Sequence, residues 1–192
     1  MHSDYKDLII IGAGGHGRVV ADAAWRSNQF SRISFLDDNP RDKPAPFPIV
    51  GSMDDLDIIT KKNNCFVVAI GDNKTRAKIQ TELESLGAEI ATVKHPSAVI
   101  GYGASFGPGT VVLANAVVSP DTSLGKGVIV NACAIVDHDA VVGNYCHIGL
   151  GAKVCSAATV CDFSLLEPAS IVPSRTSLTS RGIASVGCVM RQ

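Results

Sequence analysis

Three consecutive titratable residues interrupt an apolar stretch in the second half of the chain. Asp137, His138 and Asp139 lie within AIVDHDAVVGNYCHIG, which runs from residue 134 to 149. A carboxylate that is hydrogen-bonded to one ring nitrogen fixes the tautomer of a histidine and supports the imidazolium that forms. A histidine with an ordinary pKa near 6.5 can accept a proton at neutral pH. The triplet therefore predicts a general base, with Asp139 or Asp137 as its partner.

The triplet sits inside a repeat of six residues. Every sixth residue from Ile100 to Met190 is apolar, and the residue four positions later is small or β-branched, as far as Cys188. Those two columns lie two residues apart along the chain, so they face the same side of a strand. Three sixes form one triangular turn of a parallel β-helix, which gives about five turns in all. His138 follows the core residue Val136 by two, so it points out of the coil, either as a catalytic group or as a solvated turn histidine.

The first half of the chain lacks the six-residue repeat and predicts strands that alternate with helices. Residues 7–11, 32–39 and 65–73 predict strands, and residues 40–52, which contain four prolines, predict a loop. Helices are expected after the first strand and over residues 74–87. Gly12, Gly14 and Gly17 spell GxGxxG between the first strand and its helix. The order predicts a small βαβ unit with a parallel sheet.

The glycine loop indicates a phosphate site. Glycines allow backbone N–H groups to approach a pyrophosphate at a helix N-terminus, and an acid at the end of the second strand, Asp37 or Asp38, can hold ribose hydroxyls or a base edge. NAD and a nucleotide-sugar both present these groups. Because about ninety residues are few for two mononucleotide-binding halves, a nucleotide-sugar is favoured over NAD, and a loop without ligand is the third reading.

Composition excludes several classes of protein. The 192 residues are 46% hydrophobic and 18% charged, with a net charge of −1, which fits a folded chain and gives no general attraction for nucleic acid or an anionic membrane. The longest apolar runs are strand-sized, and the N-terminus has no signal-peptide shape. The six cysteines form no CxxC pair and no zinc spacing, so we expect no metal and a cytoplasmic location with reduced thiols.

The motifs together carry a family resemblance. GAGGHG, FLDDN, AIGDN and a hexapeptide coil with HDAVVGNYCHIGLGAK resemble the sialic acid O-acetyltransferase and sugar N-acetyltransferase group, from about Asp7 to the C-terminus. That group includes enzymes that acetylate the amine of UDP-4-amino-4,6-dideoxy sugars. The resemblance implies an α/β Rossmann-like nucleotide-sugar domain over residues 1–93 and a left-handed parallel β-helix acetyltransferase domain over residues 94–192. It also implies a homotrimer with active sites between chains, acetyl-CoA as co-substrate and a role in glycan biosynthesis.

The resemblance also assigns roles to residues. His138 and Asp139 fall on the catalytic pair, although the family usually has a glutamate in the second place. The implied substrate-binding residues are Gly12, Gly14, Gly15, His16, Gly17, Asp37, Asp38, Gly71, Asp72 and Asn73. The implied acetyl-CoA-binding residues are His147, Cys155, Ser156, Val186 and Gly187.

Two of these roles have a physical reading as well. Ser156 follows His138 by eighteen residues, so its N–H is a candidate donor to the thioester oxygen. His147 faces outward from a strand, near the acetyl group or as an interface residue. No cysteine has an obvious base, so direct transfer is expected, with a covalent role for Cys155 disfavoured.

One departure and three functions remain open. Family members usually continue with a Gly-x-Pro-Ala-Lys-like tail that helps to hold the nucleotide end of CoA, whereas this chain stops at ASVGCVMRQ. Arg175, Arg181 and Arg191 either contact CoA phosphates or are solvated. The resemblance favours a nucleotide-sugar N-acetyltransferase that acts on an acceptor of the UDP-4-amino-4,6-dideoxy-N-acetylhexosamine type. The alternatives are a sugar O-acetyltransferase of the sialic acid type and a non-catalytic trimeric binding protein.

Overall fold

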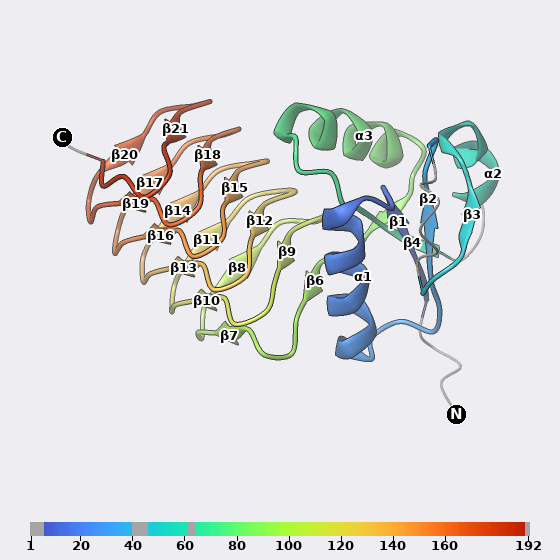
Figure 1. Ribbon diagram of the computed structural model, residues 1–192, viewed down its shortest axis with the longest axis horizontal. Coiled ribbons are helices and arrows are strands. Elements are labelled where there is room, and N and C mark those ends of the chain that lie inside the picture. The colour runs from blue at the N-terminus through green and yellow to red at the C-terminus, as the bar shows by residue number, and fades with distance from the viewer. Residues whose placement is uncertain (1–5, 40–45, 61–63, 191–192) are drawn as a thin grey trace.

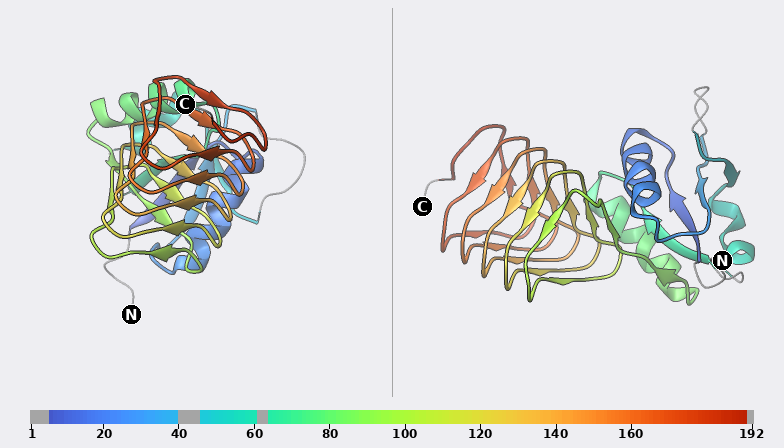
Figure 2. Two further views of the ribbon diagram at one scale, coloured as in Figure 1. Left: turned by 90° about the vertical axis from the view of Figure 1, so that its left-hand side faces the viewer. Right: turned by 90° about the horizontal axis from the view of Figure 1, so that it is seen from below.

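The computed structural model describes residues 6–39, 46–60 and 64–190. It shows an α/β unit followed by a coil of short strands, which extends away from that unit as a stack of triangular turns (Figures 1 and 2). The last strand of the first sheet ends at Ile90, and the first strand that pairs within the coil begins at Val93. The chain thus changes sheets between these residues, next to the predicted boundary at residues 93 and 94.

The N-terminal unit is a parallel sheet with helices on both faces. The strands are β1 (Asp7–Ile11), β2 (Ile33–Leu36), β3 (Ile49–Gly51), β4 (Asn64–Val68) and β5 (Glu89–Ile90), in the order β3-β2-β1-β4-β5. The helices are α1 (Gly15–Ser27), α2 (Leu56–Ile59) and α3 (Asn73–Ser85), with a 3₁₀ turn at Met53–Asp55. Leu8 and Ile10 pack on the α1 side, and Ile9 and Ile11 pack on the opposite side. The predicted βαβ unit is confirmed.

Some local expectations were wrong. The strands expected over residues 32–39 and 65–73 are β2 and β4, which end at Leu36 and Val68. Residues 40–52 are not entirely loop, because β3 pairs with β2, with Phe35 opposite Ile49; residues 40–45 lie outside the described part of the chain. The helix expected over residues 74–87 is α3. It begins at Asn73, because the Asp72 side chain accepts a hydrogen bond from the Thr75 N–H and caps the helix there.

The coil is the predicted left-handed parallel β-helix. Its strands form three sheets, in which each residue pairs with the residue eighteen positions further on, as in His147 with Leu165. The first sheet holds β6 (Val93–Lys94), β9 (Val111–Val112), β12 (Ile129–Val130), β15 (His147–Ile148), β18 (Leu165–Leu166) and β21 (Ile183–Ala184). We call it the β15 sheet.

The other two sheets have five strands each. One holds β7 (Val99–Ile100), β10 (Val117–Val118), β13 (Ile135–Val136), β16 (Lys153–Val154) and β19 (Ile171–Val172). The other holds β8 (Ser105–Phe106), β11 (Ser123–Leu124), β14 (Val141–Val142), β17 (Thr159–Val160) and β20 (Ser177–Leu178). The predicted apolar and small columns fill one continuous core between the three sheets, except at the first apolar position, where Ile100 is exposed.

The N-terminal unit docks on the outer face of the β15 sheet. Buried residues of α1, such as Val20 and Ala24, share a core with Ile129 on that face. α3 lies beside the same coil (Figure 1), and its Gln80 fills the space in which a Cβ at Gly109 would stand, 2.2 Å from the Gln80 Oε1. Gly109 and Gly127 both have positive φ, so these two turns combine a left-handed backbone with room for the helix.

Candidate active site

The glycine loop joins β1 to α1 with two glycines that the fold requires and two that leave open space. Gly12 has a φ of +98°, and a Cβ on Gly17 would lie 1.9 Å from the Gly12 carbonyl oxygen. A Cβ on Gly14 or Gly15 would meet no atom within 4 Å. The loop therefore leaves a free approach to the N-terminus of α1, which is where backbone N–H groups bind phosphates.

The acids at the end of β2 border this loop. One Asp37 carboxylate oxygen accepts from the Ala13 N–H at 2.6 Å, and the other accepts from the Asn39 N–H at 2.8 Å. Asp38 accepts from the Met53 N–H at 2.8 Å. The carboxyl ends of β1 and β2 thus meet as expected of a parallel sheet, and Asp37 also fixes the backbone of the loop.

Gly71, Asp72 and Asn73 join the two parts of the chain. The Asp72 carboxylate is occupied by the first turn of α3. The Asn73 Nδ2 donates to the carbonyls of Phe163 and Ser164 in the coil, at 3.0 and 3.1 Å. In this conformation their side chains serve the fold, and contact with a substrate remains a prediction.

His16 and His147 come together where the glycine loop meets the coil. Their ring centroids are 6.3 Å apart. The Nε2 of His16 is buried and has no hydrogen-bond partner among the described residues. Burial, with the neighbouring His147 and Arg76, lowers the pKa of His16 to about 4. His16 is therefore a neutral imidazole at pH 7, and its Nε2 is a buried polar atom without a partner among the described residues.

His147 has partners for both ring nitrogens. Asn131 uses its side-chain oxygen to accept from the Ala132 N–H, so its Nδ2 donates to the His147 Nε2 at 3.2 Å. The proton is thereby assigned to Nδ1, which donates to the Gly71 carbonyl. Burial and the nearby Arg76 lower the pKa of His147 to about 4, so the ring is neutral at pH 7 and is held in one tautomer.

His138 lies in the exposed turn between β13 and β14. Its Nδ1 is 2.7 Å from the Asp139 Oδ2, and Asp137 instead accepts from the backbone N–H of His138 at 2.8 Å. Of the two acids, Asp139 therefore contacts the ring. The hydrogen bond with Asp139, with the charges of both acids, raises the pKa of His138 above its ordinary value. No partner for Nε2 is found within residues 6–39, 46–60 and 64–190, so this nitrogen is open to a substrate proton.

The residues one or more coils along from His138 differ in what they offer. The Ser156 side chain is 3.0 Å from the Ser174 hydroxyl, whereas no acceptor for the Ser156 backbone N–H is found in the described chain. The Val186 N–H donates to Glu167 and the Gly187 N–H donates to Pro168. Cys155 is half-buried. An unpaired N–H eighteen residues from His138 fits the role of an oxyanion donor.

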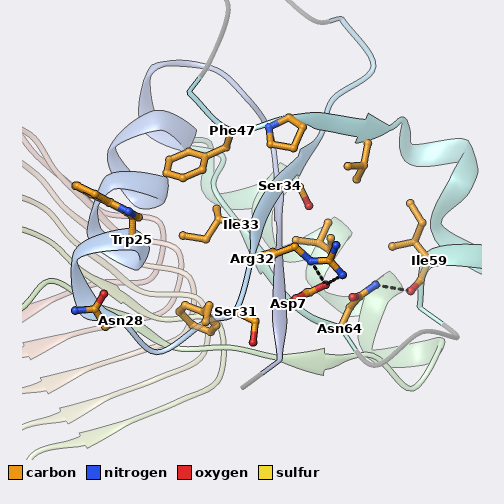
Figure 3. Close-up of a pocket in the computed structure, with 14 residues that line it drawn as sticks. Asp7, Trp25, Asn28, Ser31, Arg32, Ile33, Ser34, Phe47, Ile59 and Asn64 are labelled. Atoms are coloured by element: carbon orange, nitrogen blue, oxygen red, sulfur yellow. Dashed lines mark hydrogen bonds and ion pairs between the residues drawn. The ribbon is translucent and has the colours of Figure 1, made fainter. Parts of the chain in front are cut away.

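A separate cavity lies at the amino-terminal end of the N-terminal sheet. It has a volume of about 690 Å³ and opens at the amino ends of the strands, beside Asp7, Ile33 and Asn64 (Figure 3). Arg32 and Asp7 form an ion pair in its wall. Because ligands of open parallel sheets bind at the carboxyl ends, this cavity is separate from the glycine-loop site.

The described residues provide neither a metal site nor a membrane-spanning helix. No group of three or more His, Cys, Asp or Glu side chains there could hold a metal ion. No helix within residues 6–39, 46–60 and 64–190 is long and apolar enough to cross a membrane. Arg175 and Arg181 both occupy exposed coil corners with positive φ, and Arg191 lies outside the described residues.

Arg76 is the residue at this junction that the sequence analysis missed. It is fully buried in α3, between the Gly71 segment and the coil. Arg76, Gln80 and Leu83 follow the spacing of one helix face, and all three are buried in the structure. Because two of the three are polar, the sequence alone does not mark this face as buried.

Known proteins resemble the chain along almost its whole length. Residues 7–83 match the PglD N-terminal domain family. The acetyltransferase domain of PglB from Neisseria gonorrhoeae is 33% identical, with a TM-score of 0.92, over 97% of this chain and 91% of that one. It has also been solved in complex with acetyl coenzyme A. PerB from Caulobacter crescentus, solved with CoA and GDP-perosamine, is 25% identical with a TM-score of 0.73, over 96% and 91% of the two chains.

A curated relative agrees with these matches over a shorter span. UDP-N-acetylbacillosamine N-acetyltransferase from Bacillus subtilis is 27% identical over 118 residues, which are 57% of this chain and 52% of that protein. The match thus spans about half the length of that relative. The similarity to the PglB domain covers both the N-terminal α/β unit and the coil, and the chain therefore belongs to the hexapeptide-repeat sugar acetyltransferases.

Proposed function

We propose that the protein is an acetyl-CoA-dependent N-acetyltransferase that acts on a nucleotide-activated amino sugar, with His138 as general base. The observation that carries this proposal is the His138–Asp139 pair at 2.7 Å, with Nε2 open, on a chain that also has an open glycine loop. The relatives support the substrate class, since PerB was solved with CoA and GDP-perosamine and the curated relative is named for a UDP-amino sugar.

The proposed reaction is a direct transfer. The amine nitrogen of the sugar attacks the thioester carbonyl carbon, a C–N bond forms, the C–S bond breaks and CoA leaves. His138 Nε2 takes the proton that the amine loses and can return it to the departing thiolate. The unpaired Ser156 N–H would stabilise the oxygen that becomes negative in between. Asp139 supports the imidazolium through Nδ1.

Within one chain, the glycine loop and His138 lie on opposite sides of the coil. His138 lies at the corner between the two five-stranded sheets, and the glycine loop docks on the β15 sheet, which is the face opposite that corner. A sugar bound at the glycine loop is therefore remote from the His138 of its own chain. We propose a homotrimer in which His138 of one chain faces the glycine loop of another. Sedimentation should show a trimer, and an active monomer would contradict this arrangement.

The substrate class is tested by a thiol-release assay. Acetyl-CoA is supplied with UDP-, GDP- and dTDP-linked 4-amino sugars, and each amino sugar is paired with its 4-hydroxy counterpart. Release of CoA with an amino sugar, and N-acetylated product by mass spectrometry, is the expected result. Release with the hydroxy sugars or with sialic acid alone would favour an O-acetyltransferase. Nucleotide-sugar binding without release in any pair would favour a non-catalytic binding protein.

A further inference from the structure

The guanidinium of Arg76 is buried with no acid among its hydrogen-bond partners. Arg76 has no exposed surface, and its six hydrogen bonds all go to oxygen atoms that carry no charge. They are Nε to Gly127 O at 2.7 Å, Nη1 to Ile70 O at 2.9 Å and Gly71 O at 3.1 Å, and Nη2 to Asn73 Oδ1 at 2.7 Å, Tyr145 O at 3.0 Å and Cys146 O at 3.3 Å. Burial of a charge this deeply is costly unless every N–H is paired, and here every N–H is.

These contacts enclose His147 from two sides. The Gly71 carbonyl accepts from both Arg76 and the His147 ring. Tyr145 and Cys146, which directly precede His147, present their carbonyls to the same guanidinium. One planar group therefore fixes the acceptor of the His147 Nδ1–H and the backbone that carries the ring. Arginine suits this task because its donors lie in a rigid fork.

We propose that Arg76 is a positioning residue of the acetyl-transfer site. It holds His147 in one orientation and one tautomer, and it fixes the N-terminal unit against the coil. The proposal rests on the proposed function, because His147 lies beside the nucleotide-sugar loop and its His16. Arg76 acts through the Gly71 carbonyl and through the coil backbone, and it has no exposed surface with which to touch a substrate.

The charge of Arg76 works in the same direction as its geometry. The titratable groups around His147 and Arg76 are His16 from α1, Asp72 at the start of α3, and Tyr145 and Cys146 of the coil. Arg76 and burial disfavour the imidazolium form of both histidines. A neutral His147 keeps its Nδ1–H on Gly71 and its Nε2 as an acceptor, whereas protonation would set two donors, the Asn131 Nδ2 and the new N–H, against each other.

The test separates charge from geometry. Arg76→Lys keeps the positive charge and loses the fork, and Arg76→Met loses both. Lys78→Met is the matched control, because Lys78 is an exposed cation on the same helix. Each variant is checked for cooperative thermal unfolding, and His147 is then followed by nitrogen-15 NMR of its ring and by its pH titration. Steady-state kinetics with acetyl-CoA and the acceptor accompany these measurements.

The expected results differ for the three variants. Wild type and Lys78→Met should show one His147 tautomer, with the proton on Nδ1. Arg76→Lys should mix the tautomers while the His147 pKa stays low, and Arg76→Met should also raise that pKa part of the way toward 6.5. Both Arg76 variants should lose about 10- to 100-fold in kcat, with Arg76→Lys the more active.

Unchanged His147 signals in a folded Arg76 variant would overturn the proposal, as would a loss of activity that only follows the folded fraction. If Arg76→Met does not fold, Arg76→Lys decides alone. The NMR result is independent of turnover, so a wild type with no acetyl transfer would overturn the proposed function and leave the His147 test intact.

Discussion

At the residue scale, successive coils differ at one position, and this difference distinguishes the surroundings of the two proposed catalytic groups, the His138 ring and the Ser156 N–H. Asp137 accepts from the N–H of His138, which leaves Asp139 to bind the ring. Eighteen residues later Cys155 occupies the place of Asp137, and the N–H of Ser156 has no acceptor among the described residues. The stacking of His138 and Ser156 follows from the repeat alone. Which acid holds the ring does not, because both flank the histidine and only the turn geometry distinguishes them.

Gly14 offers a direct probe of the glycine loop. Its φ of −69° suits any residue, and a Cβ there meets no atom of the protein, so Gly14→Ala should fold normally. The methyl group should obstruct the approach of a phosphate to the loop and raise the KM of the nucleotide-sugar about tenfold, or about 1.4 kcal/mol in binding, with the KM of acetyl-CoA unchanged.

The matched variant at Gly17 should fail differently. Its Cβ would lie 1.9 Å from the Gly12 carbonyl oxygen, so Gly17→Ala should lower the melting temperature and affect both substrates together. Calorimetry and initial-rate kinetics on the two variants check this contrast. An unaltered acceptor KM in Gly14→Ala would show that the nucleotide-sugar does not approach this loop.

At the element scale, the strands that repeat with a regular period are the ones that can be predicted from the sequence. The coil strands, their stacking and the inward columns follow from the six-residue period, since each short strand can bury its apolar side only by stacking on the next. β3 and α2 have no such signal, because β3 is three residues long and follows a proline-rich stretch. Arg76 could not be predicted for a related reason, since three of its six hydrogen bonds go to backbone carbonyls of the coil, which is distant in the sequence, and not to side chains with a recognisable spacing.

The small column of the coil should be intolerant of larger side chains. Ala134 is completely buried, as are Ala116 and Ala152 above and below it. Ala134→Leu should therefore lower the free energy of unfolding by about 1–3 kcal/mol or more, because the added methylene groups have no space. Ser123→Leu, on an exposed outward position of the coil, should change it by about 0.5 kcal/mol or less. Equal effects in urea denaturation would contradict the assigned facing of the column.

At the scale of the whole molecule, the structure contains a junction between the glycine loop and the coil that neither half of the sequence predicts. His16 and His147 are far apart in the chain and lie 6.3 Å apart between ring centroids. The glycine motif does not indicate which coil it contacts, and the hexapeptide repeat does not indicate which coil carries the N-terminal unit. The proximity of His16 and His147 therefore depends on how α1 and α3 pack on the β15 sheet. The candidate site was thus predictable in its parts, and the relation between the parts was not.

The buried histidines should make stability depend on pH. Both have a folded-state pKa of about 4, below the ordinary 6.5, so between these values the unfolded chain binds more protons than the folded one. Stability should therefore fall as the pH drops from 6.5 toward 4, by on the order of 1 kcal/mol per pH unit for each histidine. The carboxyl groups of Asp72 and Glu84, whose pKa values are lowered, lose their contribution as the pH falls below their ordinary pKa values of 3.8 and 4.5.

Urea denaturation at pH 7, 6 and 5 measures this dependence. The double variant His16→Gln and His147→Gln should lose most of the slope in that window and keep the losses at lower pH. A wild-type protein that is equally stable at pH 7 and pH 5 would show that these histidines are not held neutral.

The central claim, that His138 removes the proton of the acceptor, is tested most directly by the pH dependence of kcat in wild type and His138→Ala. His138→Ala should retain the fold and the affinity for acetyl-CoA, because the side chain is exposed, and should lower kcat by about 10²- to 10⁴-fold, as expected for loss of a general base. Wild-type activity should fall as the pH drops through the pKa of His138, which Asp139 raises above the ordinary 6.5. Asp139→Asn should move this limb to lower pH at a smaller cost in rate, and His138→Ala should abolish it. A His138→Ala variant with near-wild-type kcat and the same acid limb would contradict the account.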